Sequence, residues 1–112
     1  METTIVLTRD PISSAHHTEA VRLALMLSAL EHKVNFVLID DGVYLLLAFC
    51  GYTFKNETAD ALLKSDSVRL IACRSSAEHN IPQFLSKALE VCSMADEKEI
   101  AQLLLSTRAV IF

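Results

Sequence analysis

The sequence predicts one α/β domain over residues 1–112, a three-layer α/β/α arrangement around a mostly parallel sheet of about five strands. Short apolar runs rich in Val, Ile and Leu alternate along the chain with segments of helical periodicity. The runs are nearly continuous rather than alternating, which is typical of strands covered on both faces. Strands that alternate with helices indicate βαβ units with right-handed crossovers.

The strands are expected where the apolar runs lie. Three runs are strong, at residues 3–8, 33–39 and 67–73, a fourth is plausible at residues 109–112, and a weaker one covers residues 89–94. Helical patterns cover residues 14–31, 56–64, 81–89 and 96–106. Pro82 suits the first turn of the third helix, and the acids that open the fourth favour its dipole.

The segment of residues 40–50, DDGVYLLLAFC, is apolar almost all the way round after its acidic turn. If it is helical, only one of its faces can meet the sheet. Two interpretations stay open: a well-buried helix, or a helix whose outer face packs against another subunit. Leu45, Leu46, Phe49 and Tyr52 are the candidates for such an interface.

Composition excludes several classes of function. The net charge of -4, with both signs scattered, argues against nucleic acid as a direct partner. The chain has only two glycines and no glycine-rich phosphate loop, so no nucleotide cofactor is expected. The N-terminus lacks a signal-type pattern and the apolar runs are too short to cross a bilayer. A cytoplasmic protein with no membrane association is therefore expected.

Three cysteines, Cys50, Cys73 and Cys92, are an odd number without a CxxC pair or metal-ligand spacing. In a reducing compartment they are most simply free thiols, and neither a disulfide nor a metal site is expected. Cys92 approaches a strand end without nearby cations, and Cys50 lies in the apolar segment. Cys73 is the exception, because it ends a strong strand.

The stretch LIACRSS places Cys73 where parallel sheets collect their ligands and catalytic groups, at the carboxyl end of a strand. A thiolate becomes more available near positive charge or at a helix N-terminus. Arg74 follows directly, Ser75 and Ser76 add hydroxyls and backbone N–H groups, and His79 lies on the same loop. The alternative is that Cys73 is a small buried hydrophobe.

Two other polar pairs are weaker candidates. Adjacent histidines on a helix point about 100° apart, so His16 and His17 make no shared metal face and are expected to be solvated first-turn residues. Asp40 and Asp41 follow the second strand. A phosphoacceptor receiver domain needs its acidic pair after the first strand and an aspartate after the third, where this chain has Cys73.

The segments IVLTRDP, FVLIDDGVYLLL, LIACRSSAEHNI and LLLSTRAVIF, in this order, resemble the DsrE/DsrF/TusD group of small sulfur-relay proteins. The most specific pieces are DGVY at residues 41–44 and the strand-ending Cys73. The resemblance implies a flavodoxin-like, DsrE-like fold that assembles into homo-oligomers or hetero-oligomers with related subunits. It also implies that Cys73 accepts sulfane sulfur as a persulfide from a donor protein and passes it to an acceptor protein.

The chain departs from the family pattern after the cysteine. The family usually has a loop ending in Arg-Gly, and this chain has Glu78, His79, Asn80 and Ile81 there. Asn80 could take the left-handed conformation of the missing glycine, and His79 could replace part of the missing charge. Three hypotheses follow: a persulfide carrier (a possible sulfurtransferase), a non-catalytic assembly subunit of the same fold, or a small-molecule binding module.

Overall fold

A five-stranded parallel sheet organises the chain in the computed structural model, which describes residues 2–11, 15–50 and 57–112, with the backbone alone for 57–59. The strand order is β4-β3-β2-β1-β5, and every neighbouring pair is parallel. This order differs from the 2-1-3-4-5 order of flavodoxin, so the likeness to that fold lies in the layers. The strands are β1 (Glu2–Leu7), β2 (Lys33–Leu38), β3 (Val68–Cys73), β4 (Ser93–Ala95) and β5 (Arg108–Ile111).

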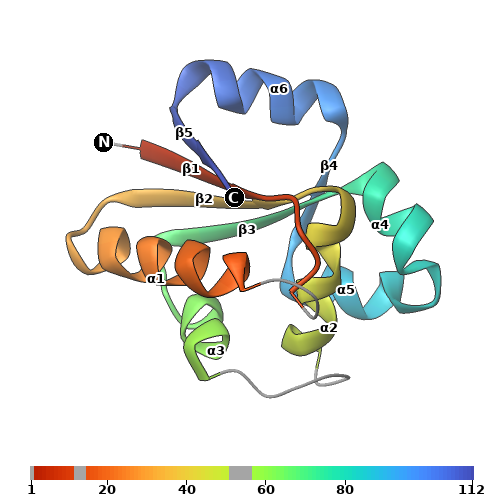
Figure 1. Cartoon of the computed structure of the whole chain (residues 1–112). Coiled ribbons are helices and arrows are strands. Elements are labelled where there is room, and N and C mark those ends of the chain that lie inside the picture. Colours follow the sequence, from red (N-terminus) through yellow and green to blue (C-terminus); the bar gives the residue numbers. More distant parts are fainter. Residues whose placement is uncertain (1, 12–14, 51–56) are drawn as a thin grey trace.

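The strand order explains how the helices are divided between the two faces of the sheet. Steps from β1 to β4 all move in one direction, so right-handed crossovers place their helices on one face. The return from β4 to β5 runs the other way and places the last helix, α6 (Glu97–Ser106), alone on the opposite face (Figure 1). The first face carries α1 (His16–Ala29), α2 (Leu45–Phe49), α3 (Glu57–Leu63), α4 (Arg74–Asn80) and α5 (Leu85–Val91).

Two apolar clusters pack on the two faces of the sheet. Leu70 and Ala72 belong to the larger one, beneath α1 to α5, whereas Ile71 and Cys73 point to the opposite face and meet Ile100 of α6. This division follows from the two-residue period of a strand. Cys73 therefore lies on the face that α6 alone covers.

Residues 40–49 are helical, and Val43, Leu45, Leu46 and Phe49 of this segment are buried within the chain. The segment forms a 3₁₀ turn, η1 (Asp40–Tyr44), followed by α2. Leu45 and Leu46 have no exposed surface and Phe49 is buried beside them. The expectation that these three side chains face another subunit is wrong, because the chain's own larger cluster encloses them. Tyr52 lies outside the described residues.

Two segments differ from their sequence prediction. Residues 74–80, expected as a loop, form α4, which begins directly after the extended Cys73 and ends before Pro82. The weak strand expected at residues 89–94 is confined to β4, because Leu85–Val91 continues as helix after the 3₁₀ turn η2 (Pro82–Phe84). Ala88 is fully buried on α5 while Lys87 and Glu90 are exposed, which is a helical rather than a strand pattern. No described helix is long and apolar enough to span a membrane.

Candidate functional site

The segments that follow β2, β3 and β4 meet at the carboxyl edge of the sheet. They enclose a cavity of about 390 Å³ between the start of α4 and the start of α6. Its polar lining comes from Asp40, Cys73, Ser75, Ser76 and Glu97, and its apolar wall from Ile39, Ile100, Ala101 and Leu104. A thiol, two hydroxyls and two carboxylates therefore face one space.

Cys73 is one of the residues that line this cavity. It is the last residue of β3 and the extended N-cap residue of α4, with 4% of its surface exposed. The pairing of β3 with both β2 and β4 holds the end of the strand, with Cys73 in register with Ala95. The sheet thus fixes the position of the sulfur, while the cavity leaves one side of it open.

The environment of Cys73 favours its thiolate. Burial by itself raises the pKa of the thiol, because a charged sulfur loses hydration. Interactions with the hydroxyls of Ser75 and Ser76 and with their backbone N–H groups act in the opposite direction and leave the pKa below its ordinary value. Hydrogen bonds, rather than a neighbouring cation, therefore produce this shift.

The two serines are held by different partners. The Ser75 hydroxyl lies 3.3 Å from the Cys73 sulfur and donates a hydrogen bond of 2.9 Å to Oε1 of Glu97. The Ser76 hydroxyl accepts a bond of 2.9 Å from the backbone N–H of Asp40. Because Asp40 is the donor in this bond, the Ser76 hydroxyl keeps its own hydrogen for another acceptor. This hydroxyl contributes to the lowered pKa of Cys73.

A second network joins α4 to η1. The side-chain amide of Asn80 donates to the carbonyl oxygens of Ser76, at 3.0 Å, and of Asp40, at 3.3 Å. Asn80 is the last residue of α4 and has no positive φ, so it does not adopt the left-handed conformation expected of it. A positive φ, of 49°, occurs instead at Asp40, where the chain turns from β2 into η1.

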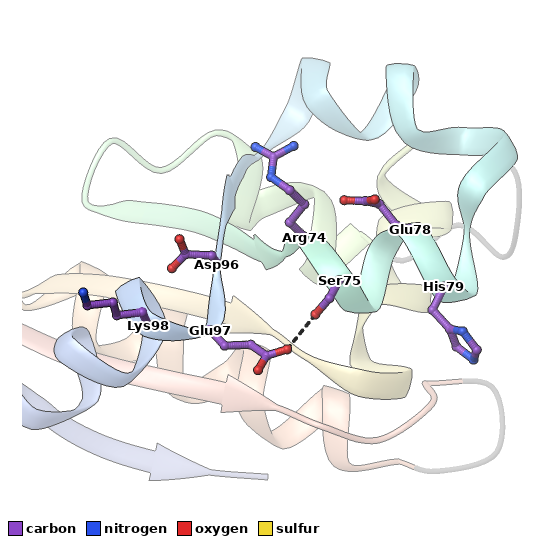
Figure 2. Close-up of a pocket in the computed structure, with 7 residues that line it drawn as sticks. All are labelled: Arg74, Ser75, Glu78, His79, Asp96, Glu97 and Lys98. Atoms are coloured by element: carbon purple, nitrogen blue, oxygen red, sulfur yellow. Dashed lines mark hydrogen bonds between the residues drawn. The ribbon is translucent and has the colours of Figure 1, made fainter.

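Arg74 and His79 lie apart from the sulfur. Figure 2 shows Arg74 extending on the same side of α4 as Glu78, and His79 at the far end of the helix with its ring directed away from Glu97. Neither residue lines the cavity of Cys73, although both line a neighbouring one of about 690 Å³. The charges of Arg74 and His79 are not among the causes of the lowered pKa of Cys73.

The other two cysteines have raised pKa values. Burial, together with the charge of Glu90, raises the pKa of Cys50, and burial beside Cys50 raises the pKa of Cys92 to about 11. Cys92 also donates its thiol hydrogen to the carbonyl of Ala88, at 3.2 Å. All three are free thiols, and Cys73 is the one whose pKa is lowered.

Of the remaining polar candidates, Asp40 lines this cavity, whereas His16, His17 and Asp41 do not. His17 is buried on α1, contrary to the expectation of a solvated residue, and lies 3.5 Å from the Thr18 hydroxyl. Within residues 2–11, 15–50 and 57–112, no three His, Cys, Asp or Glu side chains are grouped so that they could hold a metal ion.

Sequence reasoning missed Glu97, Tyr44 and the apolar wall of α6. Glu97 is one of the acids that open the helix expected at residues 96–106, where only a favourable contact with the helix dipole is expected of it. Its contact with Ser75 depends on β4 lying next to β3, which the sequence pattern does not fix. Tyr44 is the last residue of the DGVY motif, but the motif does not predict its hydrogen bond to Asn80.

Comparison with known proteins gives the same family as the motifs. The model of the DsrE/DsrF-like family matches residues 1–112. The crystal structure of the ychN protein from E. coli superposes with a TM-score of 0.72 and 18% sequence identity, over 100% of each chain. At this identity the likeness is one of fold. No curated protein matches the sequence.

Proposed function

Because the chain belongs to the DsrE/DsrF-like family, we propose that it is a sulfur-relay protein that accepts sulfane sulfur as a persulfide on Cys73 and passes it to a partner protein. The observation that carries the proposal is a thiol of lowered pKa that lines a cavity beside two hydroxyls. Such a thiol is an available nucleophile at neutral pH.

The transfer needs one thiol and no external oxidant. The Cys73 thiolate attacks the outer sulfur of a donor persulfide, R–S–SH. A new S–S bond forms on Cys73, the donor's S–S bond breaks, and the donor leaves as the thiolate R–S⁻. The proton stays on the transferred sulfur, so the product is Cys73–S–SH. Delivery to the acceptor protein is the same exchange, with Cys73 now the leaving thiolate.

The surroundings of Cys73 suit both steps. The hydroxyl of Ser76 and the backbone N–H groups of Ser75 and Ser76 stabilise negative charge on sulfur, whether sulfur attacks or leaves. Ile100 and Leu104 line the apolar side of the cavity and leave room for the added sulfur atom. Arg74 and His79, first expected to support the anion, line the neighbouring cavity instead.

The decisive experiment is intact-protein mass spectrometry after incubation with glutathione persulfide, followed by peptide mapping. We expect one added sulfur on Cys73 that a reductant removes and that is absent in Cys73→Ser. Cys50→Ser is the matched control and should load like the wild type. A folded protein that takes no sulfur on Cys73 from several persulfide donors would instead be the non-catalytic assembly subunit. A small molecule that co-purifies without sulfur on any cysteine would favour the binding module.

We also propose that the protein is cytoplasmic and acts in an assembly, either with copies of itself or with related subunits. The larger apolar side chains exposed on the described surface support assembly, among them Leu105 on α6 and Ile111 on the edge strand β5. Sedimentation analysis of the purified protein tests this part. A strictly monomeric protein at high micromolar concentration would exclude the homo-oligomer and leave related subunits as the partners to seek.

A further inference from the structure

Two neighbours compete for the single hydrogen of the Ser75 hydroxyl. Ser75 donates that hydrogen to Glu97 over 2.9 Å (Figure 2), and the same oxygen lies 3.3 Å from the sulfur of Cys73. While Ser75 donates to Glu97, it can only accept from the S–H group of a neutral thiol. It can stabilise the thiolate, as its share in the lowered pKa of Cys73 requires, only after its hydrogen leaves Glu97.

We propose that Glu97 is a positioning residue that holds the Ser75 hydrogen and so restrains ionisation of Cys73 until that hydrogen turns to the sulfur. The inference rests on the proposed function only in taking Cys73 as the reacting thiol. In the resting arrangement the bonds run from Cys73 to Ser75 and from Ser75 to Glu97. In the reactive arrangement the hydroxyl has rotated, and Ser75 donates to the thiolate instead. The proton of the thiol leaves to solvent.

Ser76 differs from Ser75 because it accepts a hydrogen bond where Ser75 donates one. Its oxygen is occupied by the N–H group of Asp40, which is a donor, so the Ser76 hydrogen is not drawn to a carboxylate at that contact. Ser76 can support the thiolate in both arrangements. Ser75 can support the thiolate only when its hydroxyl no longer donates to Glu97.

The charged groups around the thiol come from three elements. Asp40 of η1 and Glu97 of α6 line its cavity, and both are acidic. Arg74, Glu78 and His79 of α4 line the neighbouring cavity, together with Asp96, Glu97 and Lys98. Removing Glu97 therefore changes two things at once, the bond that holds the Ser75 hydrogen and a negative charge that lines the cavity. A test must separate these two effects.

A double-mutant cycle of Ser75→Ala and Glu97→Ala separates them. The readout is the rate of iodoacetamide alkylation at Cys73 as a function of pH, quantified on the Cys73 peptide. We expect Glu97→Ala to raise the rate at pH 7 by roughly threefold or more and to move the midpoint of the profile to lower pH. Adding Ser75→Ala should then lower the rate by a similar factor, whereas Ser75→Ala alone should change it less.

Glu78→Ala is the matched control, because it removes an acidic side chain of α4 that does not bond to Ser75. Equal effects of Ser75→Ala in both backgrounds would overturn the proposal, since a charge effect alone predicts them. An unchanged profile in Glu97→Ala would do the same. If Glu97→Ala does not fold, Glu97→Gln removes the charge but keeps an acceptor, and should give part of the same shift.

Alkylation needs no sulfur donor, so the two proposals fail separately. A protein that shows the coupling but takes no persulfide would retain the role of Glu97 and lose the proposed function. A protein that loads sulfur on Cys73 without the coupling would retain the function and lose the role of Glu97.

Discussion

The hydroxyl of Tyr44 donates a hydrogen bond of 3.3 Å to the side-chain oxygen of Asn80, which joins DGVY to the segment after the strand-ending cysteine. The amide nitrogen of Asn80 reaches back to the carbonyls of Ser76 and Asp40. The Asp40 N–H in turn holds the Ser76 hydroxyl beside the sulfur. Asn80 thus supports the site through its side chain, at a place where a glycine could provide only backbone freedom.

Asn80→Ala is expected to destabilise the protein more than Tyr44→Phe. The first change removes three hydrogen bonds from a half-buried position and should cost about 1–3 kcal/mol of unfolding free energy, whereas the second removes one and should cost about 1 kcal/mol. Urea denaturation measures both. Gln83→Ala, at an exposed position nearby, is the control. Asn80→Ala as stable as that control would show that the network contributes nothing.

The three cysteines are expected to titrate in a fixed order. The pKa of Cys73 is lowered, that of Cys50 is raised, and that of Cys92 is raised to about 11. Since only thiolates react, alkylation at Cys73 should reach its half-maximal rate at the lowest pH of the three, and Cys92 at the highest. Access to the thiol scales a whole profile without moving its midpoint, so the midpoints are the measurement. A Cys73 midpoint above that of Cys50 would contradict the described environment.

Strands β1, β2 and β3 and the position of Cys73 could be predicted from the sequence, because these strands are continuous apolar runs whose ends are visible in the sequence. Helix α4 could not be predicted in the same way. Its sequence, RSSAEHN, has one fully buried residue, Ala77, so it carries no apolar periodicity. Only the absence of Gly and Pro before Pro82 indicated that it could be helical.

The contact between Ser75 and Glu97 needs information that local patterns lack. It joins residues 22 positions apart and requires β4 to lie beside β3. The burial of Leu45 and Leu46 within the chain could not be predicted either, because an all-apolar helix has the same sequence whether its own chain or another subunit covers it. The strand order and the packing of η1 decide both points.

Ser76→Ala is expected to reduce the reactivity of Cys73. Ser76 favours the thiolate by its hydroxyl as well as its backbone, so removal of the hydroxyl should raise the pKa of the thiol. The alkylation rate at pH 7 should fall by roughly threefold or more, with recovery at high pH where the thiolate forms without help. Ser86→Ala, an exposed serine on α5, is the control. A rate that falls equally at every pH would indicate altered access instead.

Gly42→Ala is expected to destabilise the junction of β1 and η1. A methyl group at Gly42 would meet the carbonyl oxygen of Leu7, a backbone atom at the end of β1 that accepts from Ile39 N–H. Because the backbone must move to admit the methyl, we expect a loss of about 1–3 kcal/mol, measured by thermal unfolding. Asp41→Ala, at the exposed neighbouring position, should cost less. A variant as stable as Asp41→Ala would mean that η1 can shift freely.

Ile100 and Leu105 lie on the same helix, and truncation of Ile100 should destabilise the protein far more than truncation of Leu105. Ile100 packs against Cys73 and Ile71 on the face of the sheet that α6 alone covers, whereas Leu105 is 88% exposed. Ile100→Ala should cost about 2–4 kcal/mol of unfolding free energy, and Leu105→Ala less than about 0.5 kcal/mol. Ile100 also lines the cavity of Cys73, so its truncation should raise the alkylation rate at high pH, where ionisation is complete and access limits the reaction. Equal stability of the two variants would show that α6 does not hold this face of the sheet through Ile100.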